Sequence, residues 1–250
     1  MKLCLCIEVL LFLYTNAIGD EQLFSLYFNG TNSNQKMLAQ LEPNSLEAHQ
    51  IEALRNGTYY VDFKTLFSLS PNPKPHSLAY LNLLLYRPAI PEIDGTKPYQ
   101  EMILAFALQG ENEDNGCFIW DCFEDHSKWR ESIGILIDKL SHYEQIVCFT
   151  PQNLSTVLLR HEIIQNKEVG YRIFNLFDVM QQSSFYHPSI KAGFTLQHVA
   201  EALFPEEKLF EHSRILMEAL SNDLISYQQA KDDLITENVI VAKTYQQFFK

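Results

Sequence analysis

Four carboxylates are the side chains of this sequence best suited to chemistry: Asp62, Asp94, Asp178 and Glu237. Carboxylate oxygens are the hard anionic ligands that Mg²⁺ requires in its near-octahedral coordination. Two such ions about 3.5–4 Å apart activate a water molecule and stabilise the leaving oxygen of a phosphodiester. If at least three of these carboxylates converge, the chain is a metal-dependent nuclease. If they lie apart, that hypothesis fails.

Cysteines and histidines are weaker candidates for a site. The chain has five cysteines, and Cys117 and Cys122 bracket a Phe-Ile-Trp-Asp segment. Zinc requires about four ligands, so this pair alone does not predict a metal site, and the cysteines are typical of reduced thiols in a cytosolic protein.

His187 could contact a phosphate or act as a base. Without an evident carboxylate partner, a turn before a helix explains Tyr186-His187-Pro188 better.

Apolar runs of strand length come early in the chain. Leu78 to Tyr86 is nearly continuous in apolar residues, which is typical of a strand buried on both faces of a sheet. Further strands are predicted over 102–108, 116–121 and 145–149. The first two of these should be antiparallel, because the stretch 109–115 is a short polar turn.

Helical patterns dominate the later part of the chain. Ser45 should cap the first helix and Asn56-Gly57 should end it, and Thr195 should cap the short helix that follows it. Strands followed by helices around a mixed sheet form an α/β or α+β order. Helices are predicted over 38–54, 127–140, 154–165, 195–203, 212–220 and 227–249, and another is predicted to begin in 173–179.

A proline-rich stretch divides the chain in two. Ser70-Pro-Asn-Pro-Lys-Pro75 carries three prolines and is typical of a stiff linker. The sequence therefore predicts a small N-terminal appendage over 1–70 and a main domain over 75–250. With 46% hydrophobic residues, the main domain has enough apolar side chains to bury a core of its own.

The N-terminus fits two interpretations. Residues 1–19 have the charged start, apolar run and small residues of a secretory signal, which would make the chain a secreted interaction protein. Glu8 interrupts the apolar run, which is also shorter than the roughly 20 residues that a membrane-spanning helix needs. We therefore expect no membrane span, and we favour a strand paired with 23–28 in a cytoplasmic protein.

The charge balance disfavours nucleic acid as a partner. The formal net charge is -12 and no dense run of Lys or Arg is present. Nucleic-acid binders usually present a basic face that neutralises phosphates. No other partner is indicated by the sequence, so the partner stays unknown at this stage.

Several spaced motifs run from residue 80 to residue 196. They are Tyr80-Leu81, Pro88-Ala-Ile-Pro91, Asp94-Gly-Thr-Lys-Pro-Tyr-Gln100, Phe185-Tyr-His-Pro188 and Gly193-Phe-Thr-Leu196. Together they resemble the bacterial domain-of-unknown-function 2779 family. The resemblance covers about Pro75 to the C-terminus and implies a ribonuclease H-like fold of the DnaQ-like (DEDD) 3'-5' exonuclease type. It also implies that residues 1–70 are the remnant of an upstream nuclease-type domain.

The resemblance implies that the first acidic motif of such enzymes has been replaced here. When the sequence is aligned on Pro88, the acid-x-acid pair of the first core strand falls on Asn82 and Leu84. Tyr60-Val-Asp-Phe-Lys-Thr65 looks like the same motif with Lys in place of Glu. It lies before the proline linker, so its spacing to Pro88 argues against this alternative.

The remaining motifs of the family fall on residues that also lack the expected acid. Thr150 stands at the asparagine position of the second motif and Leu154 at its acid. The third motif falls on Asn175, with Asp178 three residues further on. The last acid aligns with Val241, one helical turn after Glu237.

These replacements lead to a catalytically inactive pseudo-nuclease as the main hypothesis. Asn is a neutral ligand, and Leu and Val are not ligands, so three or four losses remove most of the charge that attracts the ions. We expect a binding or structural role, with no catalytic residue and no cofactor. Mg²⁺ or Mn²⁺ is expected only under the alternative, in which the carboxylates named at the start have taken over as ligands.

Overall fold

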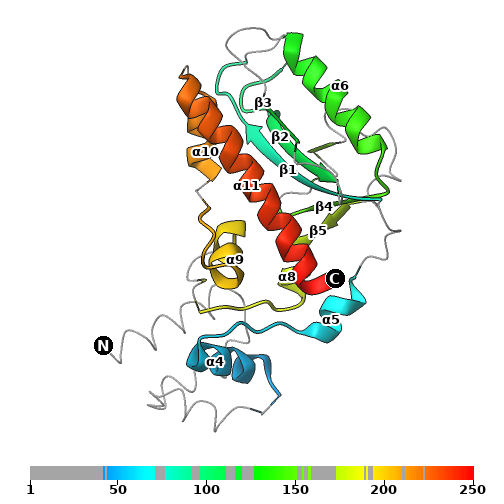
Figure 1. Ribbon diagram of the computed structural model, residues 1–250. Coiled ribbons are helices and arrows are strands. Elements are labelled where there is room, and N and C mark those ends of the chain that lie inside the picture. Colours follow the sequence, from blue (N-terminus) through cyan, green and yellow to red (C-terminus); the bar gives the residue numbers. More distant parts are fainter. Residues whose placement is uncertain are drawn as a thin grey trace.

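The protein is a mixed α/β structure in which helices flank a five-stranded mixed sheet (Figure 1). This confirms the predicted fold class and is consistent with a ribonuclease H-like fold. The computed structural model describes residues 42, 44–70, 77–91, 96–110, 116–119, 127–150, 154, 157–158, 173–188, 190, 194–209, 212–221 and 223–250.

The sheet combines an antiparallel meander with two parallel strands. Its order is β3-β2-β1-β4-β5. β1 (Leu78–Tyr86) pairs antiparallel with β2 (Met102–Gly110), and β2 pairs antiparallel with β3 (Gly116–Ile119). On its other side β1 pairs parallel with β4 (Gln145–Cys148). The strands predicted over 78–86, 102–108 and 145–149, the described part of the strand predicted over 116–121, and the antiparallel pairing of β2 with β3 are confirmed.

The fifth strand corrects one prediction. Residues 173–179 were predicted to begin a helix, but Ile173–Asn175 forms β5, parallel to β4, and the helix α8 (Leu176–Gln182) begins afterwards. Three residues are too few to show the two-residue period of a strand. Pairing with β4, which is distant in the sequence, decides their conformation.

β1 extends well beyond its parallel neighbour. It pairs with β4 only from Leu78 to Tyr80, opposite Gln145 to Val147. From Leu81 onward, the described residues that pair with β1 belong to β2, and a register shift occurs between Leu84 and Leu85. The sheet therefore opens beyond the carboxyl end of β4, which is where ligands usually bind in sheets with parallel strands.

One face of the sheet is covered by α6 (Ser127–Ser141). Leu136 and Leu140 are buried in an apolar cluster with Leu81 and Phe106. Ile137 lies on the same helix but is 38% exposed. At 100° per residue, Ile137 projects away from the stripe that Leu136 and Leu140 define.

The other face is covered by the C-terminal helices (Figure 1). The long helix α11 (Leu224–Phe249) crosses the sheet, and α10 (His212–Ala219) packs beside its first turns. The ring of Tyr245 contacts that of Tyr80 on β1, with centroids 5.9 Å apart. The short helix α9 (Leu196–Leu203) is capped by Thr195, as predicted. Among the described residues, no helix has the length and apolar character needed to span a bilayer.

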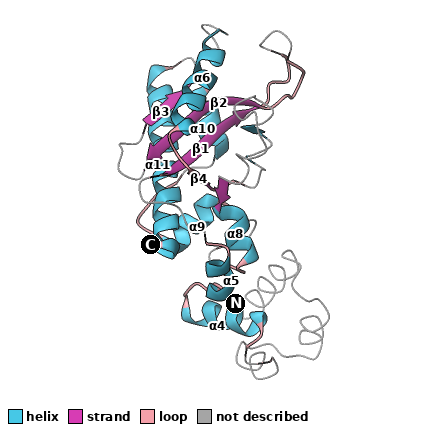
Figure 2. Cartoon of the chain, turned by 90° about the vertical axis from the view of Figure 1, so that its right-hand side faces the viewer, coloured by secondary structure: helices cyan, strands magenta, loops and turns pink. Residues whose placement is uncertain are grey.

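The segment before the proline linker packs on the end of the sheet that carries α8. Its helices α4 (Leu46–Asn56) and α5 (Phe63–Ser68) lie at the end of the molecule away from α6 (Figure 2). The caps predicted for the first helix are confirmed, with Ser45 at its start and Gly57 at its end. The backbones of Tyr60 and Tyr186 exchange two hydrogen bonds.

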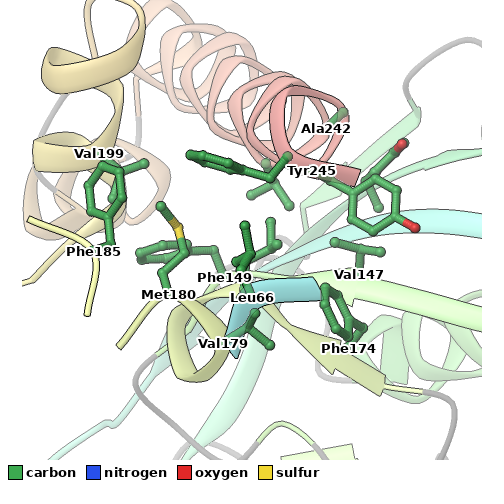
Figure 3. Close-up of a cluster of buried hydrophobic side chains, with 14 of the residues drawn as sticks. Leu66, Val147, Phe149, Phe174, Val179, Met180, Phe185, Val199, Ala242 and Tyr245 are labelled. Carbon is green, nitrogen blue, oxygen red and sulfur yellow. The ribbon is translucent and has the colours of Figure 1, made fainter. Parts of the chain in front are cut away.

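Leu66 of α5 belongs to the main core. It is fully buried, and Figure 3 shows it among Phe149, Val179 and Met180. The predicted domain boundary near residue 70 stays a prediction. The predicted strand pair over residues 3–13 and 23–28, and most of the predicted helix over 154–165, lie outside the described residues.

Candidate binding cavity

A cavity of about 780 Å³ lies where β1 parts from β4. Its walls are the second half of β1, residues 148–150 at the end of β4, and residues 194–198 at the start of α9. The lining also includes Arg87, Leu154, Val157, Leu216 of α10 and Glu237 of α11. The cavity therefore lies at the carboxyl ends of the parallel strands β1 and β4.

The polar centre of the cavity is a contact between β1 and α11. The side-chain amide Nδ2 of Asn82 donates a hydrogen bond to Oε2 of Glu237 over 2.7 Å. Glu237 is only 6% exposed. The next residue, Asn238, is fully buried and donates from its amide to the carbonyl oxygen of Tyr80. Two consecutive residues of α11 thus attach that helix to β1.

Thr150 lines the same cavity, and Asn175 holds it in place. The backbone N–H of Thr150 donates to Oδ1 of Asn175 over 3.1 Å, and Nδ2 of Asn175 donates to the carbonyl oxygen of Thr150 over 2.8 Å. Asn175 also caps α8 and donates to Asp178 Oδ2 over 2.9 Å. The amide of Asn175 therefore joins the ends of β4 and β5 and starts the helix that follows.

Leu84 and Val241 are core residues that do not line the cavity. Each is 0% exposed. Leu84 packs in an apolar cluster with Met102 and Leu234, whereas Val241 belongs to a different cluster with Val147. Of the five positions that the sequence assigned to a vestigial site, the structure places Asn82 and Thr150 at the cavity. Their origin as replaced ligands stays a prediction.

The three candidate carboxylates that the structure describes, Asp62, Asp178 and Glu237, do not form a metal-binding cluster. Asp62 caps α5, and hydrogen bonds from the Thr65 side chain and backbone hold its pKa below the usual range. Asp178 is exposed on α8, and Asp94 lies outside the described residues. Within the described part of the chain, no group of three or more His, Cys, Asp or Glu residues could hold a metal ion. Asp62, Asp178 and Glu237 therefore do not meet the condition that the alternative hypothesis set.

The other titratable side chains that line the cavity either contact a polar neighbour or are buried. The guanidinium of Arg87 forms an ion pair with Glu101, which is nearly buried. Nδ1 of His198 lies 2.9 Å from the hydroxyl of Thr195. Burial raises the pKa of the Cys148 thiol far above its usual range, so this cysteine is neutral and unsuited to nucleophilic attack.

The contact between Asn82 and Glu237 could not be found from the sequence. The two residues are 155 positions apart, and no local pattern connects them. The helical period of α11 shows which face is buried, but not which residue of β1 each turn meets. The alignment pointed to Val241, whereas the packing of α11 brings Glu237 to the cavity.

Comparisons with known proteins add little to this geometry. No protein-family model and no curated protein matches the sequence. Among solved structures, the chain is similar to the family B DNA polymerase from the hyperthermophilic archaeon Pyrobaculum calidifontis, with a TM-score of 0.47 and 15% identity. The match covers 71% of this chain and 25% of the polymerase chain, so the chain spans about a quarter of that protein. A likeness at this level establishes neither a family nor a function.

Proposed function

We propose that the chain is a degenerate member of the domain-of-unknown-function 2779 family that no longer cleaves phosphodiesters and acts by binding. The hydrogen bond from Asn82 to Glu237 carries the proposal. At the position where the resemblance expects an acid, β1 presents an amide that donates to a carboxylate. The side-chain amide of Asn82 is neutral and donates its N–H to Glu237, so the pair carries one negative charge where two carboxylates would carry two.

The charge at the cavity supports this proposal. Two divalent ions need several anionic oxygens between them. Glu237 is the one Asp or Glu among the described residues that line the cavity. Leu84 and Val241, both fully buried, face apolar neighbours and could not be replaced by a carboxylate without burying a charge.

A cleavage assay tests the proposal directly. End-labelled single-stranded DNA and RNA are incubated with the purified chain and Mg²⁺ or Mn²⁺. We expect no product above that of a heat-denatured sample. Cleavage that disappears in Glu237→Gln and persists in Asp232→Asn would overturn the proposal, because it would identify Glu237 as a metal ligand. Asp232 is a matched control, since it lies exposed on the same helix.

The proposal includes a cytoplasmic location. It follows from the interpretation of residues 3–13 as a strand paired with 23–28, and those residues lie outside the described part of the chain. N-terminal sequencing of the protein from its native cells should find Met1 or the residue after it. A mature chain that begins near residue 20 would instead support the secreted interaction protein.

A further inference from the structure

We propose that the cavity beside β1 binds an uncharged, apolar small molecule. The proposal rests on the proposed function, because it gives the binding role of the chain one class of ligand. Three properties of the cavity support it: its apolar lining, the contacts that its polar side chains make within the protein, and its volume.

One part of the lining belongs to the buried core. Leu154 and Val157 lie three residues apart in helical backbone, and both line the cavity. They pack in the apolar cluster that contains Leu81 of β1, which also lines the cavity. All three side chains are buried. Because core side chains are closely packed and fixed in position, this part of the cavity is formed before a ligand binds.

Another part of the lining is aromatic. Phe149, at the end of β4, and Phe194, before α9, line the cavity, and their ring centroids are 5.7 Å apart. The ring of Phe177 contacts both of them, with centroids 5.7 Å from Phe149 and 5.5 Å from Phe194. Three rings in mutual contact restrict one another's positions, so the cavity has a fixed aromatic wall.

Half-buried leucines give a ligand further apolar surface to cover. Leu83 and Leu85 of β1 and Leu216 of α10 line the cavity, and each keeps part of its surface exposed. Binding is stabilised roughly in proportion to the apolar area that it removes from water. These side chains therefore favour an apolar ligand.

The charged side chains of the lining already bond to other protein groups. Glu237 accepts a hydrogen bond from Asn82 over 2.7 Å, and the guanidinium of Arg87 forms an ion pair with Glu101. A charged ligand would compete with these contacts and would give up its own hydration, which is costly in a partly buried site. An uncharged ligand leaves both contacts in place.

The polar side chains at the start of α9 make similar contacts. Gln197 donates through its amide to Glu201 over 3.2 Å, and Nδ1 of His198 lies 2.9 Å from the hydroxyl oxygen of Thr195. These contacts lie within one short stretch of the chain and form without a ligand. An apolar molecule would not have to break them, and breaking a hydrogen bond of a buried group is costly.

The volume of the cavity suits a small molecule. Its value of about 780 Å³ falls within the range of about 300–1,000 Å³ that is usual for ligand pockets. Such pockets are lined mainly by apolar and aromatic side chains with a few polar groups among them. The cavity beside β1 has this composition.

Three probes with one apolar body and different head groups test the proposal. Naphthylmethanol, naphthylmethylamine and naphthoate, substituted at the same ring position, are each dialysed to equilibrium against the unaltered full chain at pH 7 without divalent ions. Naphthalene fluorescence measures the bound fraction. We expect the alcohol to bind about tenfold more tightly than either ion, because the ions must give up hydration beside charged groups that already bond to protein.

Two tryptophan variants locate the bound probe. Leu83→Trp places a larger side chain at the cavity and should weaken binding of the alcohol about tenfold, because the ring takes up space that the probe needs. Leu224→Trp adds the same ring where the side chain is 80% exposed and should bind the alcohol within about twofold of the unaltered chain. Circular dichroism shows whether each variant is folded.

Three results would overturn the proposal. They are equal or tighter binding of either ion, no binding of the alcohol, and unchanged binding of the alcohol in a folded Leu83→Trp variant. The ranking of the probes is measured on the unaltered chain, so it decides the proposal even if Leu83→Trp does not fold.

The two proposals fail in different ways. Metal-dependent cleavage would overturn the proposed function in an assay that uses none of these probes. A chain that neither cleaves nucleic acid nor prefers the alcohol would leave the proposed function standing and would remove only the uncharged ligand.

Discussion

Asp232 and Asp233 are neighbours on α11 with the same local hydrogen bond and opposite burial. Gln228 donates to Asp232 over 2.9 Å, and Gln229 donates to Asp233 over 2.8 Å. Asp232 is exposed, whereas Asp233 is buried and no described residue donates to its Oδ2. Variants of the two residues can therefore separate the effect of burial on the free energy of unfolding from the effect of the local hydrogen bond.

We expect Asp233→Asn to raise the free energy of unfolding at pH 7 and to reduce its pH dependence. The pKa of Asp233 is raised in the folded state, mainly by burial. A group of this kind favours folding below its unfolded pKa, and that contribution is lost as the pH rises through the folded value. Asn carries no charge to bury, so the variant avoids this loss.

Urea denaturation between pH 4 and pH 7 measures the effect. Asp232→Asn should follow the unaltered chain, because Asp232 is exposed. The charged groups that act on Asp233 come from α10, where Arg214 and Glu218 lie, and from Glu237 on its own helix. A slope with pH that is the same in Asp233→Asn and in the unaltered chain would contradict the expectation.

Asn82→Asp should destabilise the protein at pH 7 by about 1–3 kcal/mol, since it replaces a hydrogen-bond donor by a half-buried carboxylate beside Glu237. Denaturation by urea measures the loss. The double variant Asn82→Asp with Glu237→Gln reverses donor and acceptor across the same contact and should recover most of the stability. If the double variant is no more stable than the single one, the contact does not contribute as the geometry indicates.

At the scale of elements, the side chain of Asn175 connects the ends of β4 and β5 with the start of α8; these contacts are called the joint. Asn175 bonds to both backbone groups of Thr150 and caps the helix through the N–H of Phe177. These contacts explain why a polar residue ends the strand. They also give Asn175 a structural role that does not require it to descend from a metal ligand.

Asn175→Ala should cost about 1–3 kcal/mol, the sum of a lost helix cap and lost hydrogen bonds to partly buried backbone groups. Asn175→Asp keeps the oxygen that caps α8 and loses the amide that donates to Thr150, so its cost should lie between zero and that of the alanine variant. Thermal unfolding monitored by circular dichroism measures both. Equal stability of Asn175→Ala and the unaltered chain would show that the joint is held by the strand pairing alone.

At the scale of the whole molecule, the segment before the proline linker shares a core with the main domain. Val61 and Leu66 belong to the apolar cluster that contains residues of β4, α8 and α11 (Figure 3). Asp62 donates from its backbone to the carbonyl oxygen of Ser183 over 2.8 Å. The described contacts therefore connect residues 60–66 with the C-terminal half of the chain.

Leu66→Ala should lower the free energy of unfolding by about 2–5 kcal/mol, because it leaves a cavity in the shared core. The neighbouring Phe67 is 58% exposed, and Phe67→Ala should change stability by less than about 0.5 kcal/mol. Urea denaturation followed by fluorescence compares the two. If residues 1–70 are instead independent of the main domain, Leu66→Ala will leave the main unfolding transition unchanged.

Local sequence pattern was enough to predict most elements of this fold. The apolar run from Leu78 to Tyr86 coincides with β1, and the caps at Ser45, Gly57 and Thr195 are where they were predicted. Strand burial and helix capping depend on residues that are neighbours in the chain. For that reason they can be inferred before any tertiary contact is known.

The candidate site was decided by tertiary structure. The strand β5 exists because β4 pairs with it, and Glu237 became a cavity residue because α11 packs across β1. Sequence alone determined which side chains this protein has for chemistry, and that β1 carries an amide at residue 82. Which of those side chains meet depends on helix packing over 155 residues of separation, and a local pattern carries no information about such a contact.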